Sequence, residues 1–125
     1  MLLTIITVCY NDCANLVKTL KSIEQNFELS DGQIEIVIID GNSTDQTEKY
    51  VFDFKDNLLR QDLKVHFFSE PDKGIYDAMN KGIQKANGSW CLYLNAGDIF
   101  CDKIVADDKW FNDQYDIVYG DVVYS

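Results

Sequence analysis

Short, nearly unbroken runs of apolar residues alternate along this chain with segments in which apolar residues recur every three or four positions. Residues 2–8 (LLTIITV) and 34–39 (IEIVII) are such runs, and both are rich in β-branched residues. This pattern is typical of strands that are buried on both faces of a parallel sheet. Further strands are predicted at residues 63–68 and 90–94, and a weaker one near 117–119.

Three segments between the predicted strands have the spacing of amphipathic helices. Their apolar positions are Leu16, Leu20, Ile23 and Phe27; Thr47, Tyr50, Val51, Phe54 and Leu58; and Ile75, Ala78, Met79, Gly82, Ile83 and Ala86. We expect Asn11 or Asp12 to cap the first helix, and Ser43, Thr44 or Asp45 to cap the second. Gly88 is expected to end the third helix in the left-handed conformation.

Strands that alternate with helices favour right-handed crossovers, and hence one α/β domain with a mainly parallel sheet and helices on both faces. In such folds ligands bind beyond the carboxyl ends of the strands. The loops at that edge are residues 9–12, 40–45, 69–74 and 95–98, and each contains an acidic residue. The sequence therefore predicts a polar ligand site at one edge of the sheet. A short helix or turn is expected near residues 107–112.

The charge of the chain limits its partners. Lys and Arg number 11 and Asp and Glu 21, which gives a formal net charge of −10. Such a chain repels nucleic acid, so nucleic acid is not an expected partner. The expected partners are a cation, or an anionic ligand that binds together with a cation. No apolar run approaches the roughly 20 residues of a membrane-spanning helix. Cys9, Cys13, Cys91 and Cys101 form no CxxC pair, which favours reduced thiols over disulfides or a zinc site.

The loop after the first predicted strand carries neither the G-x-G-x-x-G pattern of dinucleotide-binding enzymes nor a P-loop. A thiol nucleophile at Cys9 is disfavoured, because the single histidine, His66, lies inside a predicted strand. Oxygen ligands at this edge suit Mg²⁺ or Mn²⁺, which commonly bind through one or two carboxylates plus substrate phosphates. Two interpretations of Asp98 remain open: it binds such a cation, or it only caps the turn after Gly97.

Four segments carry a resemblance to a known family: residues 7–11 (TVCYN), 37–45 (VIIDGNSTD), 70–82 (EPDKGIYDAMNKG) and 92–98 (LYLNAGD). In this order they resemble the nucleotide-sugar half of inverting family 2 glycosyltransferases, of the bacterial type that builds exopolysaccharide, capsule or lipopolysaccharide. The resemblance implies a Rossmann-like GT-A sandwich. Residues 1–125 would be the donor-binding part of a single domain that stops before its acceptor half.

The resemblance also implies a reaction. A sugar would move with inversion from a nucleoside diphosphate sugar, UDP-linked, to a saccharide or lipid-linked acceptor in cell-surface polysaccharide synthesis. The family's general base is expected beyond Ser125, so Asp116 and Asp121 are candidates only by default, and this chain is expected to show little turnover. The implied location is the cytoplasm, with peripheral contact at the inner face of the cell membrane.

The resemblance assigns donor-binding roles to Thr7, Tyr10, Asp40, Lys73 and Asn95. Thr7 and Tyr10 are expected to contact the nucleoside, against the alternative that they only pack at the strand end. Asp40 is expected to accept a hydrogen bond from the base, because a carboxylate can pair with the imide N–H of uracil. Lys73 is expected to approach the diphosphate, against the alternative of a solvated surface lysine, and Asn95 to bond the ribose.

The chain departs from the family pattern at two places. The family often has acids at both positions 40 and 41, where this chain has Gly41. The segment from Asn95 to Asp98 occupies the place of the acidic metal motif, but two of its acids are missing. Asp98 is the remaining candidate ligand for a divalent cation, Mg²⁺ or Mn²⁺.

A second class of function stays open beside the transferase, namely a non-catalytic nucleotide-binding or interaction module. In that case aromatic residues near the end of the chain would pack on another domain or on a second copy in a homodimer. These residues are Trp110, Phe111, Tyr115 and Tyr124.

Overall fold

A five-stranded parallel sheet forms the centre of the protein, whose computed structural model describes residues 1–107, 117–118 and 123–124. The order of strands across the sheet is β4-β3-β1-β5-β8. These strands are β1 (Leu2–Cys9), β3 (Gln33–Asp40), β4 (Leu63–Ser69), β5 (Trp90–Tyr93) and β8 (Ile117–Val118). The predicted α/β fold with a mainly parallel sheet is confirmed, as is the weak strand signal near residue 117.

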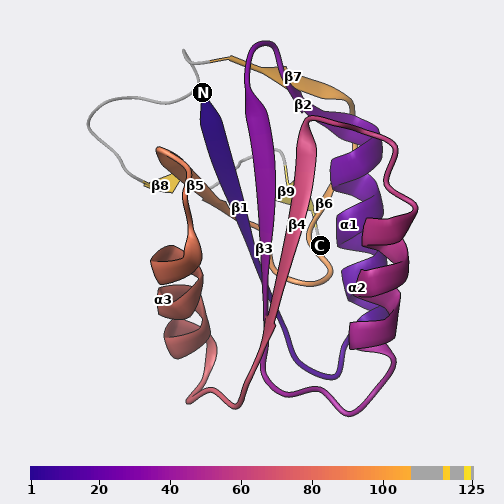
Figure 1. Cartoon of the computed structure of the whole chain (residues 1–125), viewed down its shortest axis with the longest axis vertical. Coiled ribbons are helices and arrows are strands. Elements are labelled where there is room, and N and C mark those ends of the chain that lie inside the picture. Colours follow the sequence, from indigo (N-terminus) through magenta and orange to yellow (C-terminus); the bar gives the residue numbers. More distant parts are fainter. Residues whose placement is uncertain (108–116, 119–122, 125) are drawn as a thin grey trace.

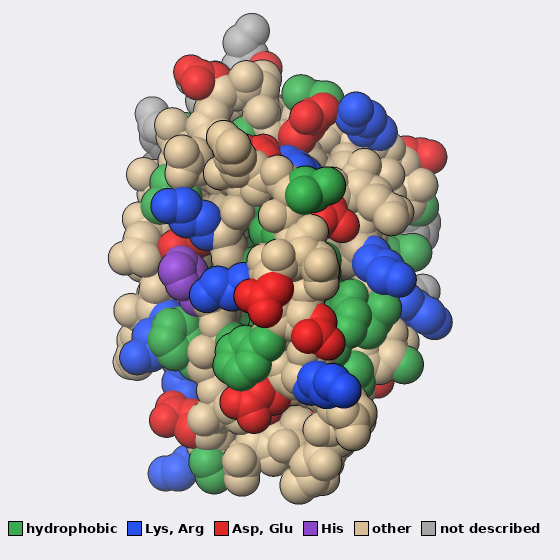
Figure 2. Space-filling model, turned by 45° about the vertical axis from the view of Figure 1, so that its right-hand side comes forward, with side chains coloured by type: hydrophobic (Ala, Val, Ile, Leu, Met, Phe, Trp, Pro, Cys, Tyr) green, Lys and Arg blue, Asp and Glu red, His purple; other side chains and the backbone are tan. Residues whose placement is uncertain are grey.

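Helices cover both faces of this sheet (Figure 1). The helices α1 (Cys13–Asn26) and α2 (Thr47–Asp56) lie on one face, and α3 (Ile75–Lys85) lies on the other. None of these described helices is long and apolar enough to cross a membrane. On the side seen in Figure 2, acidic and basic side chains are interspersed, and hydrophobic side chains form only small separate patches.

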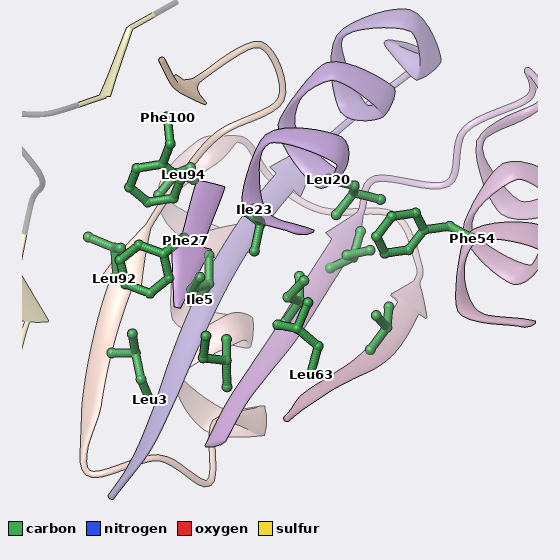
Figure 3. Packing of buried hydrophobic residues seen from close by; sticks show 14 of the residues in the cluster. Leu3, Ile5, Leu20, Ile23, Phe27, Phe54, Leu63, Leu92, Leu94 and Phe100 are labelled. Atoms are coloured by element: carbon green, nitrogen blue, oxygen red, sulfur yellow. The ribbon is translucent and has the colours of Figure 1, made fainter. Parts of the chain in front are cut away.

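The larger part of the core lies between the sheet and the pair α1 and α2 (Figure 3). Leu3 and Ile5 of β1 are fully buried there against residues such as Leu20. Because successive strand residues point to opposite faces, Ile6 packs on the α3 side instead. A Cβ at Gly82 of α3 would collide with Ile6, so glycine is what allows α3 to approach β1 closely.

The first helix is shorter than its apolar spacing predicts. It ends at Asn26, and Phe27 begins the short strand β2 (Phe27–Leu29), which pairs in parallel with β7 (Ile104–Ala106). Phe27 is buried all the same, because its ring stacks on Phe100 with centroids 4.7 Å apart. Phe100 belongs to β6 (Ile99–Phe100), which pairs antiparallel with β9 (Val123–Tyr124).

The predicted helix caps are confirmed in part: Asp12 is the N-cap residue of α1, though without a side-chain cap bond, and Asp45 caps α2. The carboxylate of Asp12 bonds the side chain of Asn15 and caps no backbone N–H of α1, and it is Asp45 that accepts the N–H of Cys13, at 3.2 Å. Asp45 also accepts the N–H of Thr47, the first residue of α2, so of the three residues expected to cap this helix it is Asp45 that does so. One carboxylate therefore serves the starts of two helices.

The third helix ends at Lys85 without a left-handed glycine, because Ala86 is already extended. Gly88 does not have a positive φ; its importance is a close approach, since a Cβ there would lie 2.6 Å from Oγ1 of Thr4. Its N–H donates to that same hydroxyl at 2.9 Å. The glycine thus seats the turn before β5 against the start of β1.

Several predictions about the end of the chain lie outside the described residues. These are the helix or turn at 108–112, the candidate acids Asp116 and Asp121, and the aromatic side chains of Trp110, Phe111, Tyr115 and Tyr124. Asp107, which is described, is not helical. Cys9, Cys13, Cys91 and Cys101 are all free thiols.

Candidate nucleotide-sugar site

The loops that follow β1, β3, β4 and β5 meet at one edge of the sheet, the lower edge in Figure 1 for the first three. Backbone hydrogen bonds extend the parallel pairing into these loops: Gly41 donates to Cys9 at 3.0 Å and Ala96 donates to Val8 at 3.2 Å. The predicted gathering of polar loops at the carboxyl edge is confirmed.

A crevice made of two adjoining cavities opens at this edge, and both cavities are lined by Tyr10 and Asp72. The first, of about 320 Å³, is lined by Val8, Cys9, Tyr10, Asp12, Asp72, Gly74, Ile75, Asn95 and Ala96. The second, of about 350 Å³, is lined by Tyr10, Gly41, Asn42, Pro71 and Asp72. The first cavity lies where the chain leaves β1 and β5, the strand pair at which the strand order reverses direction, which is the usual ligand position in open α/β sheets.

Asp40 lies at the end of β3 and is only 2% exposed. Its carboxylate accepts hydrogen bonds from the N–H of Ser43 at 2.9 Å, the hydroxyl of Ser69 at 2.7 Å, the hydroxyl of Ser43 and the thiol of Cys9. A carboxylate has about four lone-pair sites, so these four donors use its acceptor capacity. Burial, together with the neighbouring charge of Asp40, raises the pKa of the Cys9 thiol far above its ordinary value. Asp40 lines neither cavity, and its contact with a base stays a prediction.

The loop after β3 is tied to the loop after β1. Asn11 donates its N–H to the hydroxyl of Ser43 at 2.8 Å, and its Oδ1 accepts the N–H of Thr44 at 2.7 Å. Asn11 has φ +47°, a left-handed conformation that asparagine tolerates better than most residues. The Thr47 hydroxyl and the backbone donors of Thr47 and Cys13 hold the pKa of Asp45 below its ordinary value. These contacts close the two loops on each other.

The loop after β4 is held by the side chains of α3. The carboxylate of Asp77 accepts the N–H of Lys73 at 2.9 Å, and this bond, with the charge of Lys81, lowers the pKa of Asp77. Lys81 donates to the carbonyl of Pro71 at 2.9 Å and lies 3.2 Å from the Glu70 carboxylate. Desolvation opposes the charge on Lys81, but Glu70 and Asp77 outweigh it and raise its pKa. Lys73, Asp77 and Lys81 lie four residues apart, and this spacing allows the two α3 side chains to hold the backbone of the loop after β4.

The side chains at the tip of this loop are exposed. Tyr76 is 81% exposed and Ile75, which lines the first cavity, is 49% exposed. Lys73 is exposed on the same loop, and its backbone N–H, not its ammonium, makes the bond to Asp77. Sequence reasoning proposed Lys73 but missed Asp72 as a crevice residue. The available signal was its position in the loop directly after a predicted strand.

Thr7 and Tyr10, the two nucleoside candidates of the first strand, have opposite environments. Thr7 is completely buried, and alternation along β1 places it on the same face as Ile5 and Cys9. Its hydroxyl has no hydrogen-bond partner among the described residues. Tyr10 is 61% exposed and lines both cavities. The structure thus brings Tyr10, and not Thr7, to the crevice.

Asn95 and Asp98 form one tight turn after β5. Asn95 donates its N–H to Oδ2 of Asp98 at 3.0 Å, and Asp98 donates its N–H to the carbonyl of Asn95 at 2.9 Å. Asn95 lines the first cavity, and its buried Oδ1 has no hydrogen-bond partner within the described part of the chain. Asp98 lines neither cavity, so the structure does not bring Asp40 and Asp98 into this crevice together.

A resident metal is poorly matched by these side chains alone. In residues 1–107, the described stretch that carries the four loops, no group of three or more His, Cys, Asp or Glu side chains is placed to hold a metal ion. The Asp98 carboxylate stabilises the turn, as one of the two interpretations of the sequence expects. Its oxygen chemistry fits a hard cation only if other ligands complete the coordination.

A parallel α/β sheet with a crevice at its carboxyl edge belongs to the class of nucleotide-binding folds. Comparison with known sequences defines the family. The profile described as Glycosyl transferase family 2 matches residues 4–124, so the chain belongs to this family. The predicted resemblance is confirmed.

Characterised relatives share most of the chain. A PGL/p-HBAD biosynthesis glycosyltransferase of Mycobacterium bovis is 40% identical over 96 residues, which cover 74% of this chain and 36% of that protein. The poly-beta-1,6-N-acetyl-D-glucosamine synthase of Staphylococcus epidermidis is 30% identical over 109 residues, or 87% of this chain and 24% of that protein. The chain thus spans about a third or less of the length of these relatives.

Solved structures show the same fold. S. aureus TarS 1-349 in complex with UDP-GlcNAc has a TM-score of 0.64 and 26% identity, covering 79% of this chain and 27% of TarS 1-349. The mannosyltransferase PcManGT from Pyrobaculum calidifontis, in complex with GDP-Man and Mn²⁺, has a TM-score of 0.70 and 22% identity, covering 81% of this chain and 29% of the other. The GT-A architecture expected from the sequence is confirmed by these neighbours.

Proposed function

We propose that the protein binds a nucleoside diphosphate sugar, UDP-linked, in the crevice at the carboxyl edge of its sheet and transfers the sugar with inversion to a saccharide or lipid-linked acceptor. The observation that carries the proposal is the crevice shared by Tyr10 and Asp72 in a chain of family 2. An exposed aromatic ring offers a stacking surface for a base, and the loops around it offer backbone and side-chain partners. The UDP-GlcNAc complex of TarS supports a UDP-linked donor.

Within this proposal the crevice residues have separate tasks. Tyr10 stacks on the nucleoside, the exposed ammonium of Lys73 approaches the diphosphate, and the side chain of Asn95, which lines the first cavity, bonds the ribose. Thr7 and Asp40 are buried near the ends of β1 and β3, where they shape the strand ends that border the crevice. A base contact by Asp40 requires that one of its four protein donors gives way to the ligand.

The proposed cofactor is Mg²⁺ or Mn²⁺, held by Asp98 together with the donor's diphosphate. One carboxylate plus phosphate oxygens is a common way for such ions to bind, so the cation is proposed to arrive with the donor. When bound, it neutralises charge on the departing diphosphate. The Mn²⁺ in the PcManGT complex supports this proposal.

The proposed role is in the synthesis of a cell-surface polysaccharide. The protein itself is proposed to lie in the cytoplasm, in peripheral contact with the inner face of the cell membrane. The proposed role is supported by the polysaccharide synthase among the relatives. The alternative is a non-catalytic nucleotide-binding or interaction module. A nucleotide-binding module would use the same crevice without turnover, and transfer assays on the intact protein separate it from the transferase. An interaction module would bind no nucleotide and form a stable dimer, which a nucleotide titration and a measurement of oligomeric state detect.

A titration by calorimetry tests the donor site. UDP is expected to bind more tightly in the presence of Mn²⁺ than in its absence, and ADP is expected to bind weakly. Tyr10→Ala should weaken UDP binding with and without Mn²⁺, whereas Asp98→Asn should abolish the gain that Mn²⁺ gives. Absence of UDP binding under both conditions contradicts the proposal.

A further inference from the structure

Of the two acids that line the crevice, Asp72 is the one with a carboxylate oxygen that accepts no hydrogen bond within the described residues. Oδ1 of Asp72 accepts the N–H of Gly74 at 3.0 Å, while no hydrogen bond or ion pair to Oδ2 occurs among the described residues. Asp12, the other acid that lines the crevice, bonds the amide of Asn15 through both its oxygens, at 3.0 and 3.1 Å. Asp40, next to the crevice, is already bonded to four protein donors.

The missing side chain at position 41 makes room for this carboxylate. A Cβ built on Gly41 would lie 2.9 Å from Oδ2 of Asp72 and 3.2 Å from Cδ1 of Tyr10. The first distance is too short for a real Cβ contact, so any other residue at position 41 would displace the Asp72 carboxylate or the Tyr10 ring. Glycine here has no positive φ, and its role is therefore the space it leaves.

The loop presents Asp72 in a fixed position. The bonds from the Gly74 N–H to Asp72, from the Lys73 N–H to Asp77, and from Lys81 to the carbonyl of Pro71 hold consecutive residues of the loop. A carboxylate held in this way loses little further freedom when a ligand donates to it, which favours specific recognition.

We infer that Asp72 is a specificity-determining residue: its Oδ2 accepts a hydrogen bond from an N–H of the nucleobase that stacks on Tyr10 in the cavity formed with Gly41. The inference deepens the proposed function and rests on it, because it names the group that reads the base. A uracil base has a donor at N3, whereas cytosine has an acceptor at the same ring position. Asp72 therefore selects UDP over CDP.

The test compares Asp72→Asn with the original protein in titrations with UDP and CDP. Asparagine retains an oxygen for the Gly74 N–H and turns its amide N–H₂ toward the crevice. Loss of a hydrogen bond to a charged group weakens UDP binding by roughly 10- to 100-fold. CDP binding is expected to hold or improve, because the new amide donates to N3 of cytosine, so the preference for UDP shrinks or inverts.

A second pair of variants keeps the inference falsifiable if the amide disturbs the loop. Gly41→Ala should weaken UDP binding in the original protein by displacing Oδ2, but less in the Asp72→Ala background, where only the Tyr10 ring still lies close to the new Cβ. Equal loss of UDP and CDP affinity in Asp72→Asn, or no change in either, overturns the inference while the proposed function stands. Failure of the original protein to bind any pyrimidine nucleotide overturns both.

Discussion

The loop after β3 and the loop after β4 border the same crevice but use their polar groups in opposite ways. In the first, Asp40 and Asp45 bond the chain's own backbone, hydroxyl and thiol donors. In the second, Asp77 and Lys81 fix the backbone, and the side chains of Asp72 and Lys73 extend from it. An acid at a ligand-binding edge is thus available to a ligand only if its lone pairs are not already used by the protein.

This difference predicts where a lost carboxylate affects stability and where it affects binding. Asp40→Ala leaves buried donors without an acceptor and is expected to lower the free energy of unfolding by about 3 kcal/mol. Asp72→Ala removes a partly exposed side chain and should change it by about 0.5 kcal/mol. Urea unfolding of both variants measures the contrast. Similar losses in the two variants would refute the distinction between the loops.

Lys81→Met tests whether the open loop needs its anchor. Without the bonds to Pro71, Glu70 and Asp77 the loop loses its fixed geometry, and UDP affinity is expected to fall roughly fivefold through misplacement of Asp72 and Lys73. The measurement is the dissociation constant of UDP. Lys49→Met, an exposed lysine of α2, is the matched control and should leave it unchanged.

The closed loop offers a comparison between its two left-handed asparagines. Asn11→Gly keeps the conformation but removes the acceptor of the Thr44 N–H, and should cost about 1 kcal/mol of unfolding free energy. Asn42→Gly removes no side-chain hydrogen bond to any described residue and relieves a φ of +71°, so a change within about 0.5 kcal/mol is expected. If Asn42→Gly lowers the unfolding free energy as much as Asn11→Gly does, the hydrogen bond from Thr44 to Asn11 is not the source of the stability that Asn11 contributes.

The stability of both loops is expected to depend on pH. Each is held by a carboxylate whose pKa lies below the ordinary value: Asp45 holds the first loop, and Asp77 of α3 holds the second. A group whose pKa is lowered by folding stabilises the protein above its unfolded pKa, about 3.9 for Asp. That stabilisation is lost as pH falls below this value through the folded pKa. Asp45→Asn and Asp77→Asn should therefore each flatten the decline of unfolding free energy between pH 5 and pH 3. A decline of unchanged steepness in both variants would contradict the assignment.

The sequence predicted the sheet, the three helices and the edge at which polar loops gather, because strand and helix periodicity report directly on burial. It could not show which acids would be satisfied internally. The bonds of Asp40 come from Cys9, Ser43 and Ser69, residues of three different loops or strands that only the fold brings together. The segment of residues 70–82 resembles a ligand-binding motif, yet its Asp77 and Lys81 side chains bond the backbone of the loop after β4. In the sequence, Gly41 stands where the family often has a second acid. In the structure, the absence of a side chain at Gly41 leaves the space that the Asp72 carboxylate occupies.

The crevice at the carboxyl edge is proposed to bind the nucleotide of a UDP-sugar. Following backbone amide resonances during a UDP titration tests this proposal most directly, since every loop reports separately. Shifts are expected to be concentrated in residues 9–12, 40–45, 69–74 and 95–98. Shifts concentrated at the opposite edge, in residues 30–32 and 87–89, or no shifts at saturating UDP, would contradict it.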